Sequence, residues 1–257
     1  MPETHGNFVW YELMTTDAKA GEAFYRDVVG WGAQKAGVPG VDYTLLTAGS
    51  TPTAGMMTMP AEVCAAGWRP GWMGYVAVDN VDATARRVIE LGGRVYKEPQ
   101  DIPGVGRFAV VADPQGAAFA LIKWETPHED VAAAPGTPGH AGWRELYAGD
   151  LTTAFEFYSR LFGWTKASAI DMGPMGTYQL FGLGGEPMGG MMTKCEQIPQ
   201  PGWNYYFNVD GAGAAAERVK KKGGQILNGP LEVPGGSWVV QGRDPQGATF
   251  ALVSRSA

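Results

Sequence analysis

The chain contains two similar copies of one long segment, the first starting at Phe8 and the second at Ala141. The first copy reads FVWYELMTTDAKAGEAFYRDVVGW, and the second reads AGWRELYAGDLTTAFEFYSRLFGW. The same spacing separates Trp10 from Trp143 and Glu12 from Glu145, so the copies align without a gap. Self-similarity of this length indicates a duplicated domain, and both halves are expected to share one fold.

Three further short motifs occur in both halves. Gly-Met-Met stands at 55–57 and 190–192, Pro-Gly-Trp at 70–72 and 201–203, and Asp-Pro-Gln-Gly at 113–116 and 244–247. Between the halves lies ETPHEDVAAAPGTPGHA, which has three prolines and no apolar periodicity and is typical of a linker. We therefore predict a first domain over 1–124, a linker over 125–141 and a second domain over 142–257.

The composition suits two globular domains and excludes some partners. Of the 257 residues, 45% are hydrophobic and 18% charged, which is enough apolar material for two cores. The net charge of −6 and the pI near 5.1 argue against a nucleic-acid or membrane partner, because phosphate groups are bound by clustered lysine and arginine. The basic run at 220–222 is expected to end a helix.

The two cysteines, Cys64 and Cys195, are too few for a disulfide framework, so we expect reduced thiols. The N-terminal residues lack the basic and apolar regions of a signal peptide. No segment approaches the ~20 apolar residues of a membrane span. We expect a cytoplasmic protein.

Each half is predicted to contain two βαβββ units. In the first half, alternation predicts a strand over 8–14, and Asp17 and Gly30 are expected to begin and end a helix. Strands are predicted at 33–37, 42–48 and 53–59, followed by a loop at 60–70. The second unit has a strand at 74–78, a helix led by Asp79 and Asp82, and strands at 94–98, 106–112 and 117–124. Four such units would pair into curved mixed sheets with outer helices, an α+β fold with concave cavities.

These features resemble the vicinal oxygen chelate superfamily, which contains glyoxalase I, bleomycin-resistance proteins and extradiol dioxygenases. The resemblance rests on the Asp-capped helix with Phe-Tyr and Gly-Trp, at 17–31 and again at 150–164, and on the two Asp-Pro-Gln-Gly turns. It implies two tandem glyoxalase-like domains. Isomerases, lyases, dioxygenases, thiol transferases and binding proteins share this fold, so the fold alone leaves the activity open.

Metal-dependent members of the superfamily hold a divalent ion through His, Glu or Gln on the inner face of the sheet. The resemblance places those positions at Trp10, Met57, Met73 and Ala120 in the first half, and at Trp143, Met192, Asn204 and Ala251 in the second. None of these side chains suits such an ion. The histidines, His5, His128 and His140, lie in the N-terminal segment and the linker. We expect no metal of the family type and no other cofactor.

Two carboxylates are candidates for catalysis. Alternation along the first strand of each half places Glu12 on the same face as Trp10, and Glu145 on the same face as Trp143. In one interpretation the carboxylate is a general base, or an anchor for a ligand hydroxyl or amine, with its pKa raised by apolar surroundings. In the other it is structural and accepts hydrogen bonds from a loop backbone or from an arginine such as Arg107 or Arg243.

Two other features have simpler interpretations. The Met-Met pairs suit either an adaptable apolar pocket or ordinary core packing. The glycine-rich stretch at 182–190 lacks the Lys-Ser/Thr ending of a phosphate-binding loop, so it is expected to connect the strands of a hairpin.

The sequence favours a protein that binds a small, largely apolar or aromatic molecule in a metal-independent cavity, as a monomer or weak homodimer. The alternative is a glyoxalase-like lyase, isomerase or hydroxylase/dioxygenase-type enzyme that uses Glu12 or Glu145, with or without a divalent metal. The residues expected to contact the ligand are Trp10, Met57, Met73, Tyr75, Trp143, Met192, Asn204 and Tyr206. Because Asn204 corresponds to Met73, the second cavity is expected to be the more polar one.

Overall fold

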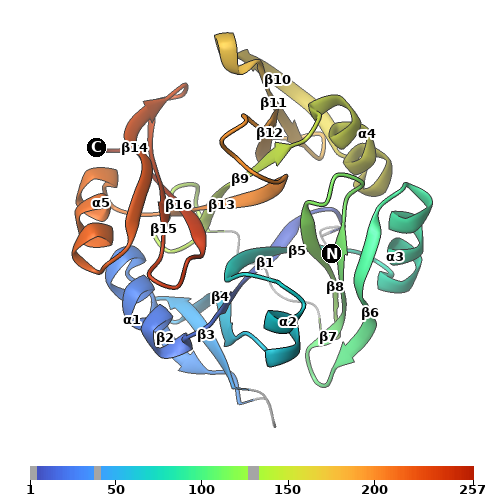
Figure 1. Cartoon of the computed structure of the whole chain (residues 1–257), viewed down its shortest axis with the longest axis horizontal. Coiled ribbons are helices and arrows are strands. Elements are labelled where there is room, and N and C mark those ends of the chain that lie inside the picture. Colours follow the sequence, from blue (N-terminus) through green and yellow to red (C-terminus); the bar gives the residue numbers. More distant parts are fainter. Residues whose placement is uncertain (1–4, 38–41, 127–132) are drawn as a thin grey trace. The chain divides into compact units, whose positions relative to one another are not determined.

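The structure is a computed structural model that describes residues 5–37, 42–126 and 133–257. It consists of four modules of similar construction (Figure 1). Module 1 comprises β1 (Phe8–Thr15), α1 (Ala18–Val29), β2 (Gly32–Lys35), β3 (Tyr43–Ala48), β4 (Thr51–Thr58) and the short α2 (Ala61–Ala65). Module 2 comprises β5 (Gly71–Ala77), α3 (Val81–Glu90), β6 (Arg94–Ile102), β7 (Gly106–Ala112) and β8 (Ala118–Trp124).

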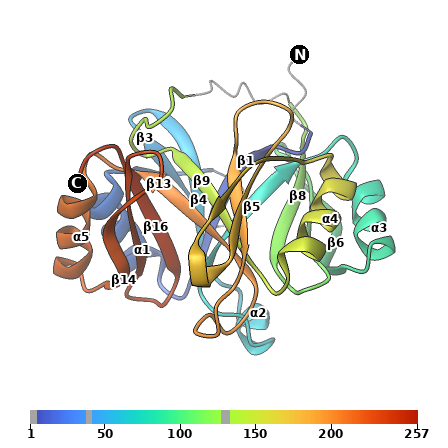
Figure 2. The same cartoon turned by 90° about the horizontal axis from the view of Figure 1, so that it is seen from above.

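The second half of the chain repeats this order. Module 3 comprises β9 (Ala141–Ala148), α4 (Leu151–Phe162), β10 (Thr165–Asp171), the 3₁₀ turn η1 (Gly173–Met175), β11 (Thr177–Gly182) and β12 (Gly189–Thr193). Module 4 comprises β13 (Gly202–Asn208), α5 (Ala212–Lys221), β14 (Gln225–Val233), β15 (Ser237–Arg243) and β16 (Thr249–Ser254). In Figure 2, α5 lies against strands β14 and β16, and α3 lies beside β6.

The strands form two eight-stranded mixed sheets, in the orders β2-β3-β4-β1-β5-β8-β7-β6 and β10-β11-β12-β9-β13-β16-β15-β14. Within every module the first and last strands run parallel, as in the pairs β1–β4, β5–β8, β9–β12 and β13–β16. The remaining strands of each module join through antiparallel pairs. The predicted α+β fold of four βαβββ units is therefore confirmed.

The helix ends in the repeated segments follow the capping residues of the sequence. Asp17 accepts a hydrogen bond from the backbone of Ala20 at 2.9 Å, and Asp150 accepts one from Thr153 at 2.8 Å. Gly30 and Gly163 follow their helices with φ of 91° and 76°, the left-handed region that favours glycine. Both ends of α1 are confirmed.

Two local predictions are wrong. The expected loop at 60–70 contains α2, which follows Pro60, a residue whose fixed φ suits the start of a helix. The helix expected to be led by Asp79 and Asp82 has Asp82 in its first turn, as predicted, but its N-cap is Asn80, whose side chain accepts the backbone N–H of Ala83 at 2.9 Å. The expected hairpin connection at 182–190 is confirmed, because it joins β11 to the antiparallel β12. The run at 220–222 ends α5, as predicted.

The chain divides into two compact units, and each combines modules from both halves of the sequence. One unit comprises Met1–Val9, Gly74–Val131 and Arg144–Trp203, and so contains modules 2 and 3. The other comprises Trp10–Met73, Ala132–Trp143 and Asn204–Ala257, and contains modules 1 and 4. Each compact unit therefore combines one module from each half of the sequence, and neither unit is a consecutive half. The domain limits at 124 and 142 stay a prediction.

A buried hydrogen-bonded chain starts at Trp72, at the beginning of β5, and joins α1 of module 1 to the Asp-Pro-Gln-Gly turn of module 4. Trp72 donates its indole N–H to the hydroxyl of Tyr25 at 2.9 Å, and this hydroxyl donates to Asp244 at 3.0 Å. Asp244, in the Asp-Pro-Gln-Gly turn, also accepts the backbone N–H groups of Gln246 and Ala248, both at 2.9 Å. Because the carboxylate has several donors, its burial is compensated.

The same chain recurs in the unit of modules 2 and 3. Trp203 donates to the hydroxyl of Tyr158 at 3.0 Å, and this hydroxyl donates to Asp113 at 3.1 Å. The ring of Tyr158 stacks on Trp164 with centroids 5.2 Å apart. The duplicated Phe-Tyr and Asp-Pro-Gln-Gly motifs are thus partners, and each pair links one half of the sequence to the other.

A glycine ahead of the first strand of each half completes the link. The indole of Trp31 donates to the carbonyl of Gly139 at 2.7 Å, and that of Trp164 donates to the carbonyl of Gly6 at 2.8 Å. Gly139 has φ of 79°, and a Cβ there would lie 2.8 Å from Ala48. Only glycine fits this approach without strain.

Candidate functional site

The first strand of module 1 has two distinct faces. Alternation places Leu13 on one face, where it is fully buried, and a Cβ added to Gly21 of α1 would lie 3.8 Å from it. Trp10 and Glu12 belong to the other face, which is turned away from α1. Both are nonetheless buried, each with 8% of its surface exposed. The sheet therefore carries a buried carboxylate on the face opposite its helix.

Glu12 belongs to a short chain of hydrogen bonds. Its Oε2 accepts the hydroxyl of Tyr43 at 2.8 Å, and the oxygen of Tyr43 accepts the indole N–H of Trp10 at 3.0 Å. Burial, followed by the charge of Glu12, raises the pKa of Tyr43 well above its ordinary value. Tyr43 therefore stays protonated and acts as a donor to the carboxylate.

A glycine makes this arrangement possible. Gly55 lies opposite Glu12 in the parallel register of β1 and β4. A Cβ at Gly55 would lie 1.9 Å from the hydroxyl oxygen of Tyr43 and 2.4 Å from its Cζ. The phenol ring thus lies directly over the glycine, in space that any other residue would fill.

Module 3 repeats the same geometry. Gly190 lies opposite Glu145 in the register of β12 and β9, and a Cβ there would lie 2.2 Å from Cζ of Tyr178. Glu145 has 7% of its surface exposed. The Glu–Gly–Tyr arrangement is therefore duplicated, which the spacing of Gly-Met-Met alone does not reveal.

The structure divides each Met-Met pair between two environments. Met56 and Met191 are fully buried, and a Cβ added to Gly21 of α1 would lie 3.0 Å from the sulfur of Met56. Met57 and Met192 are half-buried and belong to the faces of Glu12 and Glu145. The core interpretation holds for the first methionine of each pair, and the second shares a face with the candidate site.

The corresponding face of module 2 is closed by aromatic packing. Tyr75 and Met73, expected to contact ligand, have 4% and 5% of their surfaces exposed. The ring of Tyr75 lies 6.4 Å from that of Phe108, and the ammonium of Lys97 lies 5.2 Å from the Phe108 centroid. Ala120, opposite Tyr75 in the register, is fully buried.

The corresponding face of module 4 is more open and more polar. Tyr206, Val239 and Ala251 form a buried cluster, against which the half-buried side chains Trp143, Leu231, Val233 and Val253 pack. We refer to these seven residues, six from module 4 and Trp143 from β9 of module 3, as the module 4 cluster. Gln241 donates to the hydroxyl of Tyr206 at 2.6 Å. Among the described residues, Oδ1 of the half-buried Asn204 is enclosed and has no hydrogen-bond partner.

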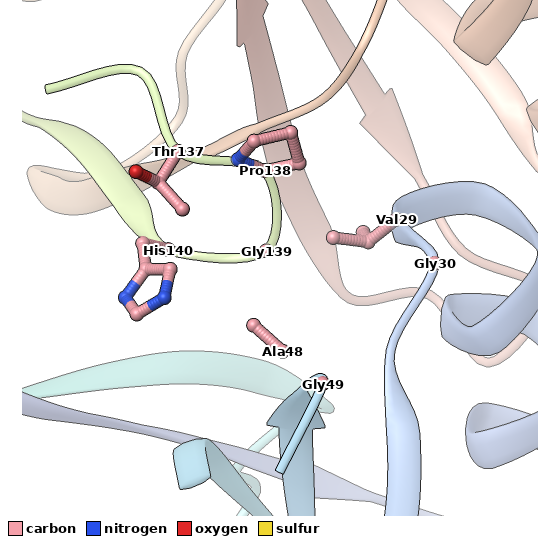
Figure 3. Close-up of a pocket in the computed structure, with 8 residues that line it drawn as sticks. All are labelled: Val29, Gly30, Ala48, Gly49, Thr137, Pro138, Gly139 and His140. Atoms are coloured by element: carbon pink, nitrogen blue, oxygen red, sulfur yellow. The ribbon is translucent and has the colours of Figure 1, made fainter. Parts of the chain in front are cut away.

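A separate pocket of about 320 Å³ lies beside the linker in the unit of modules 1 and 4. Figure 3 shows Val29, Ala48, Pro138 and His140 around it, together with the backbone of Gly139. Burial lowers the pKa of His140, so its imidazole is neutral at neutral pH. The other described histidine, His5, is paired with Asp79 at 3.4 Å, and His128 lies outside the described residues.

The positions that the superfamily uses for metal ligands do not fit a divalent ion here. Trp10 offers an indole N–H, which is already donated to Tyr43, and Ala120 and Ala251 offer no donor atom. In the ranges that the structure describes, no three His, Cys, Asp or Glu side chains gather in one place. Likewise, no helix in those ranges is long and apolar enough to cross a membrane.

Sequence reasoning missed the partner of Glu12. It considered Arg107, which instead forms ion pairs with Asp82 and Asp101 at 2.7 and 2.8 Å. A usable signal was present, since Tyr43 and Tyr178 stand at the same distance before the glycines of the two Gly-Met-Met motifs. Cys64 and Cys195 are exposed free thiols.

Both halves match glyoxalase family models. A model described as a glyoxalase-like domain matches residues 10–122. A model described as the Glyoxalase/Bleomycin resistance protein/Dioxygenase superfamily matches residues 137–252. Together the two matches cover most of the chain.

Several proteins are similar over nearly the full length, and two of them are from Mycobacterium tuberculosis and Streptomyces peucetius. "Putative glyoxylase CFP32" of Mycobacterium tuberculosis is 33% identical over 250 residues, which cover 95% of this chain and 93% of that protein. "Anthracycline biosynthesis protein DnrV" of Streptomyces peucetius is 32% identical over 257 residues, covering 95% and 91%. Among solved structures, the Mn(II)-bound glyoxalase from Novosphingobium aromaticivorans is similar with a TM-score of 0.67 and 18% identity, over 99% of this chain and 83% of that one. At this identity the likeness concerns the fold alone.

Proposed function

Because this chain belongs to the Glyoxalase/Bleomycin resistance protein/Dioxygenase superfamily, we propose that it binds a small, largely aromatic or apolar molecule without a metal ion. The proposal rests on one observation above all. The first-strand position that would carry a metal ligand holds a tryptophan in both halves, and each indole lies among aromatic or apolar neighbours. Such surroundings favour stacking and apolar burial over coordination of an ion.

The buried carboxylate favours a ligand that carries a polar group. The hydroxyl of Tyr43 holds one oxygen of Glu12 in a defined place. Glu145, on the same face as Trp143, repeats the arrangement with Gly190 and Tyr178, and a buried carboxylate among apolar side chains suits an anchor for a ligand hydroxyl or amine. One relative is named for anthracycline biosynthesis, which is in keeping with this proposal.

The test combines metal analysis with an unbiased ligand screen. Protein purified without chelators is expected to contain far less than one divalent ion per chain, and EDTA is expected to leave its melting temperature unchanged. In a thermal-shift screen, aromatic compounds should raise the melting temperature equally with and without EDTA, because binding stabilises the folded state by mass action. A stoichiometric divalent ion, or hits that EDTA abolishes, would overturn the proposal.

A second candidate function is a glyoxalase-like lyase, isomerase or hydroxylase/dioxygenase-type activity with Glu12 or Glu145 as base. The observation that favours it is the burial of both carboxylates, at 8% and 7% exposure, on duplicated Glu–Gly–Tyr arrangements. The name of the mycobacterial relative, "Putative glyoxylase CFP32", is in keeping with this function. Conversion of a thermal-shift hit, followed by mass spectrometry and abolished in Glu12→Gln, would establish this function instead.

A further inference from the structure

Modules 2 and 4 derive from the same repeat, so their differences can be compared position by position. The strand registers align Tyr75 with Tyr206, since these residues lie opposite Ala120 and Ala251 in equivalent parallel pairs. The same registers align Phe108 with Val239, which lie opposite Ile122 and Val253. The residues of these strands on one face therefore have structural counterparts on the other, whereas Trp143 of the cluster corresponds to Trp10 of module 1.

In module 2 the protein fills this face with its own side chains. Phe108 lies beside Tyr75 and is covered by the ammonium of Lys97. Ile122 has only 2% of its surface exposed. Phe108 and Ile122 thus leave little apolar surface for a ligand to cover, and Val110 on the same face is half-buried.

In module 4 the same positions hold smaller or more polar residues. Val239 replaces the ring of Phe108, and Asn228 stands where Lys97 covers that ring. Val253, the counterpart of Ile122, is half-buried, as are Trp143 and Leu231 beside it. The cluster thus keeps apolar surface that the rest of the module does not cover, and covering this surface would be favourable.

The polar groups of module 4 indicate which kind of ligand could cover the apolar surface of the cluster. Gln241, the counterpart of Val110, donates to Tyr206, so one polar pair stands within the apolar cluster. Asn204, the counterpart of Met73, carries an enclosed amide oxygen without a partner among the described residues. An unsatisfied enclosed oxygen is costly, and the terminal torsion of asparagine rotates readily, so a ligand donor could pair with it without backbone movement.

We propose that the module 4 cluster is the ligand-binding face of this protein, that it takes one aromatic molecule bearing a hydroxyl group, and that its module 2 counterpart binds none. This proposal rests on the proposed function and adds the place, the stoichiometry and the polar group of the ligand. The aromatic body packs against Trp143 and the aliphatic side chains of the cluster. The hydroxyl donates to the amide oxygen of Asn204.

The test uses 2-naphthol, with 2-methoxynaphthalene as a probe of similar shape that cannot donate a hydrogen bond. Calorimetric titration of the full chain should show one 2-naphthol per chain, bound about tenfold more tightly than the methyl ether. Asn204→Met, which installs the residue of module 2, should remove this preference. Val239→Phe should weaken both probes at least tenfold by filling the face, whereas Phe108→Leu in module 2 should change neither affinity. Melting temperatures identify any variant that fails to fold. If Val239→Phe fails to fold, the result for Asn204→Met decides the test.

The outcomes separate this inference from the proposed function. Two equal sites per chain, or a preference for 2-naphthol that survives in Asn204→Met, would overturn the inference while aromatic binding itself stands. If other aromatic compounds bind and 2-naphthol does not, the inference is likewise overturned while the proposed function stands. If no aromatic compound binds the wild-type chain in either experiment, both the inference and the proposed function fail.

Discussion

The hydroxyl of Tyr25 donates to the carboxylate of Asp244 at 3.0 Å, although 219 residues separate them in the chain. Tyr158 and Asp113 make the equivalent contact in the other compact unit. Each contact lies in a buried aromatic core and joins a helix of one half to a turn of the other. The two halves of the chain are thus joined by buried hydrogen bonds between their repeated motifs, and several expected properties follow from these contacts.

Tyr25→Phe is expected to destabilise the fold by about 1.5–3 kcal/mol at pH 7, the range for a lost hydrogen bond to a charged group. Burial raises the pKa of Asp244, so the folded protein binds the proton of this group more tightly than the unfolded chain does. Burying Asp244 therefore costs stability above the raised pKa, and the cost is relieved as the pH falls through it. The loss in Tyr25→Phe should accordingly be smaller in acid than at pH 7.

Urea unfolding of Tyr25→Phe at pH 7 and near pH 4 measures this difference. Tyr158→Phe is the matched variant, because Asp113 also has a raised pKa owing to burial. A loss independent of pH in both variants would show that the carboxylates take no part.

Residues 1–126 produced alone are expected to self-associate rather than fold as a monomer. In the full chain Tyr25 pairs with Asp244 and Trp31 with Gly139, both outside this fragment. A second copy would supply the repeat equivalents, Asp113 and Gly6. Sedimentation of the fragment, alone and mixed with residues 133–257, tests this, and a folded monomeric fragment would contradict it.

Gly55→Ala is expected to destabilise the protein by about 1–3 kcal/mol, because the new methyl group would occupy the space of the Tyr43 ring. In a Tyr43→Ala background the same change should cost much less. A double-mutant cycle by denaturant unfolding gives the coupling between the two positions. Gly190→Ala with Tyr178→Ala is the corresponding cycle in module 3, and additive effects in both cycles would refute the steric argument.

Glu145→Gln, on the same face of β9 as Trp143, is expected to weaken binding of an aromatic ligand found by screening by about 1.5–3 kcal/mol, whereas Glu12→Gln, on the other sheet, is expected to leave affinity and melting temperature nearly unchanged. Glutamine keeps an oxygen that can accept the hydroxyl of Tyr43, and it loses only the charge. Affinity and melting temperature should be measured together for Glu12→Gln and Glu145→Gln. Lower stability with unaltered affinity would instead identify a structural carboxylate.

The predicted and observed sites agree on Glu12 and differ on its partner. Strand alternation was enough to place Glu12 and Trp10 on one face, because the period of two is a local property of the backbone. The hydrogen bond to Tyr43 depends on a strand register and on the missing Cβ of Gly55, across a chain separation of 31 residues. No local pattern specifies such a contact.

The loop expected at 60–70 illustrates the same limit on a smaller scale. Five of its residues, Ala61–Ala65, form a helical turn with no buried residue. An exposed turn has no apolar stripe, so periodicity cannot detect it. Asp17 and Gly30 were assigned correctly, because capping depends on the side chain and on φ of a single residue.

The amino-acid sequence alone determined that this protein is a duplicated chain of four βαβββ modules, because repeats, caps and alternation act over a few residues. Which modules share a core was decided by packing. The Phe-Tyr helix and the Asp-Pro-Gln-Gly turn are present in each half, and the sequence is compatible with their pairing inside one half or between halves. The folded chain pairs Tyr25 with Asp244 and Tyr158 with Asp113, because that choice buries the aromatic rings around hydrogen-bonded carboxylates whose donors come from distant segments.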